Sequence, residues 1–113
     1  MRYAMRRDLN DTEITDAIKA AGFSIVDYTK AGLGIPDKLA LKLLPQVGEY
    51  GEPIHFICWI EIKSKYGKLS ETQQLAKSVW EPRGEWIEAR TAEQTVRDLL
   101  ERYEAKVKPE CAR

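Results

Sequence analysis

Apolar and polar residues alternate along two neighbouring stretches in the middle of the chain. Leucines occupy positions 39, 41 and 43, shortly after Asp37, and a second, largely apolar run extends from Ile54 to Lys63. Alternation with a period of two predicts β-strands. The intervening residues 45–53 contain two prolines and two glycines, which predict a turn. We therefore expect an antiparallel hairpin over residues 37–63.

The register of this hairpin follows from the position of its turn. With a turn centred near Glu49, facing residues have numbers that sum to about 98, so that Asp37 faces Glu61. Side chains alternate between the two faces of a strand, and Lys63 therefore points to the same face as Glu61, one pleat further on. We expect two carboxylates and a lysine to converge at one rim of the sheet.

Three segments place apolar residues at helical spacing, each behind residues typical of a helix cap. Asn10 to Glu13 resembles a capping box and precedes apolar positions 14, 17, 18 and 21. Ser70 to Gln73 forms a second capping box, before a helix that ends near Trp80. Residues 91–94 cap a third helix that continues to position 103.

Two shorter strands, 23–28 and 86–89, complete the expected order α-β-β-β-α-β-α. The 113 residues suit one domain, residues 1–113, with a core over about 8–104. Residues 105–113 are polar and predict a frayed tail. No repeat, linker or low-complexity segment indicates a second domain.

Charge and composition limit the classes of function. Lysine plus arginine equals aspartate plus glutamate at 18 each, so contact with nucleic acid must come from local patches. No apolar run is long enough to cross a bilayer or to form a signal peptide, and we expect an intracellular, cytoplasmic protein. Cys58, Cys111 and the single histidine, His55, indicate neither a disulfide framework nor a cysteine-rich metal site. His55 is expected to be structural.

The paired acids predict a metal site. Two carboxylates this close repel each other unless a cation lies between them, and hard oxygen ligands suit Mg²⁺ or Mn²⁺ better than zinc. The backbone carbonyl of Ile62 is placed to be a further ligand, and Lys63 would orient water or stabilise a pentavalent phosphate. The alternative is that Glu61 and Lys63 form an exposed strand end and that Asp37 is a turn residue after proline.

The chain resembles the PD-(D/E)XK nuclease superfamily. Pro36-Asp37 matches the first half of the superfamily motif and Glu61-Ile62-Lys63 the second half. The closer similarity is to small standalone VRR-Nuc type nucleases of phages and bacteria and to archaeal-type Holliday-junction resolvases. It covers about residues 8–100, and further matches are Glu13, Gly34-Ile35, Lys68-Leu69-Ser70 and Gln73. The resemblance implies an α/β, restriction-endonuclease-like α-β-β-β-α-β core with a central mixed sheet flanked by helices.

The resemblance also implies roles for individual residues. Asp37 and Glu61 would hold the metal ion, and Lys63 would be the catalytic lysine. Glu13 would be the acid on the first helix that completes the metal site, but a glutamate at this position also suits a capping box. Gln73 has the same two interpretations, as a capping residue and as the glutamine of the second helix near the scissile phosphate.

Basic residues cluster in sequence around the expected site and predict contacts with DNA phosphates. The alternative is an ordinary solvated face. Tyr66 lies in an expected mobile tip that could stack on distorted DNA, pack in the core or simply be exposed. The three tryptophans are expected in the core. The expected phosphate contacts are Arg6, Arg7, Lys30, Lys38, Lys65 and Lys68.

The expected function is that of a Mg²⁺-dependent endonuclease that cuts branched or structured DNA during recombination or repair, in particular a Holliday-junction resolvase. Symmetric cleavage of a four-way junction needs two sites related by a two-fold axis, so we expect a homodimer. The alternatives are a nuclease acting on flap, nicked or duplex DNA, a DNA-binding module whose site is no longer used, and a structural protein without a nucleic-acid role.

Overall fold

A computed structural model describes residues 2–31, 35–64 and 66–111, with side chains for residues 10–110 within these ranges. Four strands form one mixed sheet in the order β1-β2-β3-β4. The strands are β1 (Ser24–Asp27), β2 (Lys38–Val47), β3 (Pro53–Ile62) and β4 (Trp86–Ala89). β1 to β3 pair antiparallel, whereas β3 and β4 pair parallel. This arrangement confirms an α/β fold with a mixed sheet flanked by helices.

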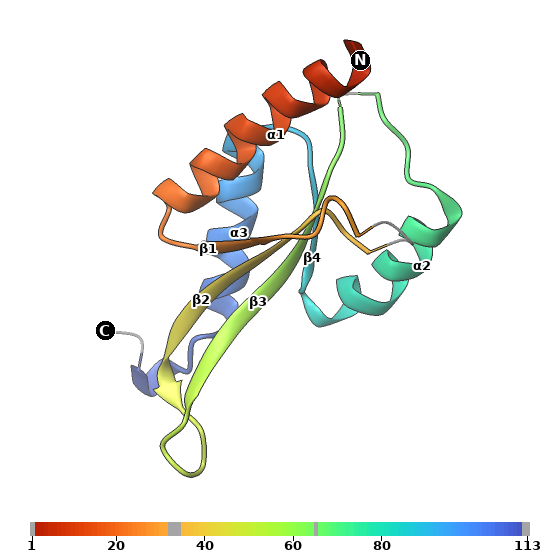
Figure 1. Cartoon of the computed structure of the whole chain (residues 1–113). Coiled ribbons are helices and arrows are strands. Elements are labelled where there is room, and N and C mark those ends of the chain that lie inside the picture. Colours follow the sequence, from red (N-terminus) through yellow and green to blue (C-terminus); the bar gives the residue numbers. More distant parts are fainter. Residues whose placement is uncertain (1, 32–34, 65, 112–113) are drawn as a thin grey trace.

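The helices are α1 (Arg2–Ala20), α2 (Glu71–Trp80) and α3 (Ala92–Lys106), with short 3₁₀ turns η1 (Glu81–Arg83) and η2 (Pro109–Cys111). α1 and α3 lie together against one face of the sheet, and α2 forms the crossover between β3 and β4 (Figure 1). A crossover helix is what two parallel strands require.

The core lies between the sheet and the pair of helices α1 and α3. Ile14 and Ile18 of α1 and Leu99 of α3 are fully buried, and they cover Ala40 of β2 and Cys58 of β3. Burial raises the pKa of the Cys58 thiol to about 12, which keeps the thiol protonated. The alternation read from the sequence thus separates a packed face from a second face that is less covered, where Leu43 and His55 pair and are both exposed.

The start of the first helix differs from the prediction. α1 begins at Arg2, so Asn10 is not an N-cap and Glu13 does not close a capping box. Residues 2–9 are rich in alanine, methionine, arginine and leucine, which favour a helix, and nothing among them stops it. Asn10 instead donates a hydrogen bond from Nδ2 to the Lys63 carbonyl, at 3.3 Å. A residue that looked like a cap therefore connects α1 to the end of β3.

The hairpin turn and the C-terminal segment also differ from expectation. Residues 45–47 belong to β2, and a register shift between Leu43 and Val47 accommodates Pro45. The predicted frayed tail is held at residues 106 and 108: the Gln46 side-chain Nε2 donates to the Lys106 carbonyl at 2.8 Å, and the Lys108 backbone amide donates to Gln46 Oε1 at 3.4 Å. These contacts hold the chain after α3 against the end of β2.

Candidate functional site

Asp37 and Glu61 lie side by side at one end of the sheet. β2 and β3 pair Lys38 with Ile60, and the same register places Asp37 opposite Glu61, as the sequence predicts. The Ile62 amide donates to Asp37 Oδ2 at 3.0 Å. Glu61 is completely buried and Asp37 is 6% exposed. The structure therefore confirms the adjacency of the two carboxylates and excludes an exposed strand end for Glu61.

The backbone of Ile62 faces the same space. In an antiparallel strand the N–H and C=O of one residue point to the same neighbouring strand. Because the Ile62 amide points to Asp37, the Ile62 carbonyl is directed to the Asp37 side of β3. Two carboxylates and a carbonyl oxygen form a donor set that suits Mg²⁺ or Mn²⁺.

Gln73 closes the predicted capping box and also contacts one of the two acids. Its backbone amide and side chain form the capping box with Ser70 at the start of α2. Its Nε2 atom also donates to Glu61 Oε2 at 3.1 Å. The cap fixes the position of the glutamine, and the glutamine orients the Glu61 carboxylate.

The backbone at Lys63 is held from two sides. Its amide donates to the Ala89 carbonyl at 2.9 Å, which continues the parallel ladder beyond β3, and its carbonyl accepts from Asn10. The Arg90 guanidinium donates to the carbonyl of the next residue, Ser64. The Lys63 side chain is half-buried and shares the face of Glu61.

A third carboxylate, Glu88, lies beside Glu61. β3 and β4 pair Glu61 with Glu88, so their side chains share a face. Glu88 forms ion pairs with Lys77 at 3.3 Å and with Arg90. Burial acts to raise the pKa of Glu88, but the hydrogen bonds from Arg90 and Lys77 outweigh it and lower the pKa below its ordinary value. The sequence did not indicate this cluster of Glu88, Lys77 and Arg90, because the register of a parallel strand pair cannot be derived from local sequence.

Glu13 is not brought to the two acids. It is exposed on α1, whereas Asn10 makes the contact between this helix and the site. Within the described ranges, no three side chains of histidine, cysteine, aspartate or glutamate are grouped so that they could hold a metal ion. The candidate metal centre consists of Asp37 and Glu61 with the Ile62 carbonyl.

The basic residues expected to contact phosphate differ in burial and in their partners. Lys38 is only 5% exposed and pairs with Asp11 at 3.0 Å and Asp27 at 2.8 Å, so it is a structural cation rather than a surface one. Burial acts to lower the pKa of Lys38, but its hydrogen bonds to Asp27 and Asp11 raise it. Lys30 and Lys68 are exposed. The side chains of Arg6 and Arg7, as well as Lys65 and Gly34, lie outside the described residues.

The aromatic residues are also distributed differently from the expectation. Trp86 is 1% exposed, which confirms its core position, whereas Trp59 and Trp80 are only half-buried. Tyr66 is 82% exposed in the turn that follows β3, so core packing is excluded for it. Half-buried tryptophans beside the acids form a surface that the sequence did not indicate.

Comparison with protein-family models, with curated proteins and with solved structures finds no match to this chain. In the parts of the chain that the structure describes, no helix is long and apolar enough to span a membrane. Any functional assignment therefore depends on the residues of the site and on their geometry.

Proposed function

We propose that this chain is a metal-dependent endonuclease that hydrolyses phosphodiester bonds in structured DNA. The observation that carries the proposal is the placement of Asp37 and Glu61, two buried carboxylates on adjacent strands, with Lys63 one pleat beyond Glu61. Two carboxylates held this close repel each other, and a divalent cation bound between them would relieve this repulsion.

The donor set fits magnesium or manganese. Asp37 and Glu61 would hold the ion together with the Ile62 carbonyl, and water would complete the coordination. When bound, the ion supplies positive charge to the scissile phosphate and acidifies the attacking water. Glu13 is outside this ligand set in the structure, because it is exposed on α1.

The side chains around the acids have separate tasks in this proposal. Gln73 holds Glu61 through the 3.1 Å hydrogen bond, so that the carboxylate presents its other oxygen in a fixed direction. Lys63 stabilises the charge that builds on the phosphate in the transition state, where a positioned ammonium contributes most. The contacts from Asn10 and Ala89 hold the Lys63 backbone, from which this side chain extends, in place.

The order of the elements supports the assignment to a restriction-endonuclease-like core. The chain runs α1-β1-β2-β3-α2-β4-α3, with the acids at the start of β2 and near the end of β3. We propose four-way junctions as the substrate, cut by a two-fold dimer, because the neutral chain gains little from long-range attraction to uniform duplex.

Purified protein incubated with duplex, flap and four-way-junction DNA, with and without Mg²⁺, tests the proposal. We expect cleavage only with the divalent ion, fastest on the junction, and none by Lys63→Ala. Lys106→Ala, at an exposed lysine at the end of α3, is the matched control and should cut normally. Absence of cleavage of all three substrates with Mg²⁺ and with Mn²⁺ would contradict the proposed endonuclease activity. Metal-independent binding without cleavage would favour a DNA-binding module.

A further inference from the structure

Aromatic side chains lie directly beside the acidic residues, on the same face of the sheet. Trp59 precedes Glu61 by two residues on β3, so both point to the same side, about 7 Å apart along the strand. The Tyr28 amide donates to the Asp37 carbonyl at 2.8 Å, which extends the β1–β2 pairing to the acid. An aromatic surface and the candidate metal centre are therefore contiguous.

The rings form one connected cluster. Tyr28 and Trp59 have ring centroids 5.5 Å apart, and Trp59 and Trp80 have centroids 6.0 Å apart, both with tilted planes. All three residues are half-buried, so each keeps part of its surface exposed to solvent. We call Tyr28, Trp59 and Trp80 the aromatic cluster.

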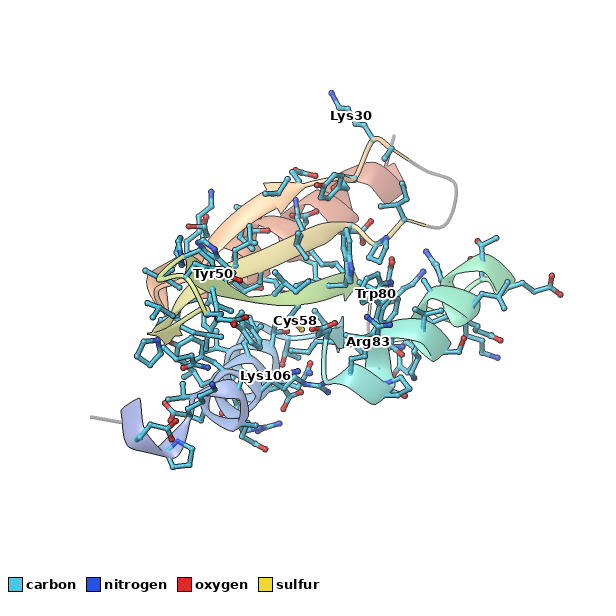
Figure 2. The ribbon with its side chains drawn as sticks, turned by 90° about the horizontal axis from the view of Figure 1, so that it is seen from below. Lys30, Tyr50, Cys58, Trp80, Arg83 and Lys106 are labelled. Atoms are coloured by element: carbon cyan, nitrogen blue, oxygen red, sulfur yellow. The ribbon has the colours of Figure 1, made fainter. Side chains whose placement is uncertain are left out.

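A guanidinium group extends this cluster. Arg83 lies 5.5 Å from the centroid of the Trp80 ring and is exposed. Tyr50 lies at the hairpin turn, and Trp80 and Arg83 lie near the other end of the sheet (Figure 2). A cation stacked on a partly exposed aromatic ring is a combination that attracts both the face of a base and a phosphate.

We propose that the aromatic cluster and Arg83 bind an unpaired nucleobase of a nucleic-acid strand. The cluster offers aromatic ring surface, and stacking on aromatic side chains tolerates any base. Paired bases inside a duplex do not expose their faces, so the surface selects strands with an unstacked nucleotide. Placing that nucleotide next to the scissile phosphate rests on the proposed nuclease function, and it then requires the DNA to be unstacked at the cut.

Binding can be measured without catalysis. Wild-type protein in EDTA is titrated with an oligothymidylate of about a dozen nucleotides, with a length-matched blunt duplex and with the same oligomer carrying abasic sites, while tryptophan fluorescence is recorded. We expect the oligothymidylate to quench fluorescence and to bind about tenfold more tightly than the abasic oligomer, because the charge is equal and only stacking is lost. Equal affinity for the two oligomers would overturn the proposal, as would tighter binding of the duplex.

Variants locate the site. Trp80→Ala should weaken oligothymidylate binding about tenfold, and Trp80→Phe should retain most of the affinity because an aromatic face remains. Tyr50→Ala removes an aromatic side chain that is 88% exposed at the hairpin turn, and it should bind like wild type. Arg83→Gln, at an exposed position that should not impair folding, tests the same surface independently and should also weaken binding. Unchanged binding by both Trp80→Ala and Arg83→Gln would place the contact elsewhere.

The two proposals fail in different ways. Oligothymidylate binding that depends on Trp80, without metal-dependent cleavage of any DNA, would refute the proposed nuclease activity and support the proposed base-binding surface. Metal-dependent cleavage that requires Lys63, with no effect of the abasic sites or of Trp80→Phe and Trp80→Ala, would refute the base-binding surface and keep the nuclease.

Discussion

Replacing Glu61 by glutamine should stabilise the metal-free protein. Asp37 and Glu61 face each other across an antiparallel pair, where Cβ atoms are about 5 Å apart. Two unit charges that are also about 5 Å apart repel by about 3 kcal/mol at an effective dielectric constant of about 20. Glutamine removes the repulsion and keeps an acceptor oxygen for the Gln73 amide.

The net gain should be smaller than this Coulomb energy. The Ile62 amide and the Gln73 amide already stabilise the charged carboxylates, and a neutral glutamine benefits less from them. We therefore expect Glu61→Gln to raise the free energy of unfolding by about 1–2 kcal/mol without metal. For a domain of this length, this corresponds to an increase in Tm of about 4–8 °C.

Metal should reverse the order of stability. An ion at about one hundred times its Kd stabilises the native state by about 2.7 kcal/mol, or about 10 °C in Tm, and Glu61→Gln should lose this gain. Thermal unfolding with EDTA and with Mn²⁺ measures both effects, and calorimetry measures ion binding directly. Glu101→Gln, on the exposed side of α3, is the matched control. A variant that is less stable than wild type in EDTA, or that binds Mn²⁺ as well as wild type does, would contradict this prediction.

Three further predictions concern charged side chains around the site. Lys63→Ala should abolish cleavage while DNA affinity is mostly kept, and a change confined to KM would move Lys63 to the binding surface. Lys38→Met should lower the free energy of unfolding by about 2 kcal/mol in a urea titration, because Asp11 loses a nearly buried ion pair while the more exposed Asp27 is rehydrated. The lowered pKa of Glu88 means that its ion pairs stabilise the fold above its ordinary pKa and that this stability is lost as the pH falls through the folded pKa. Glu88→Gln should therefore show a weaker loss of stability on acidification than wild type.

The hairpin could be predicted from the sequence because its information is local. Two alternating runs on either side of a turn determine which residues face each other, and the pairing of Lys38 with Ile60 follows the predicted register. The Ser70 capping box was equally readable, since all of its partners lie within one turn of helix. Local patterns of this kind placed Asp37, Glu61 and Gln73 correctly.

The remaining contacts depend on partners that are distant in sequence. The parallel pairing that places Glu88 next to Glu61 is determined by how the α2 crossover packs, and no local pattern encodes it. The burial of Lys38 requires Asp11 from α1 and Asp27 from β1, so the sequence showed only a lysine at the start of a strand. Asn10 was misinterpreted for a related reason. Asparagine favours helix caps, but from a position inside a helix its side chain can also bond to a residue that is distant in sequence.

Helix α2 connects the two parts of the proposed nucleic-acid surface. None of its side chains is buried, so it is held to the sheet by contacts along its length: Gln73 with Glu61, Lys77 with Glu88 and Trp80 with Trp59. A helix with so little buried apolar surface has low local stability. Its position therefore depends on the same side chains that orient the carboxylate and form the aromatic cluster. A base stacked on Trp80 and a cation at Glu61 would each restrict α2, and each would thereby favour the geometry that the other needs.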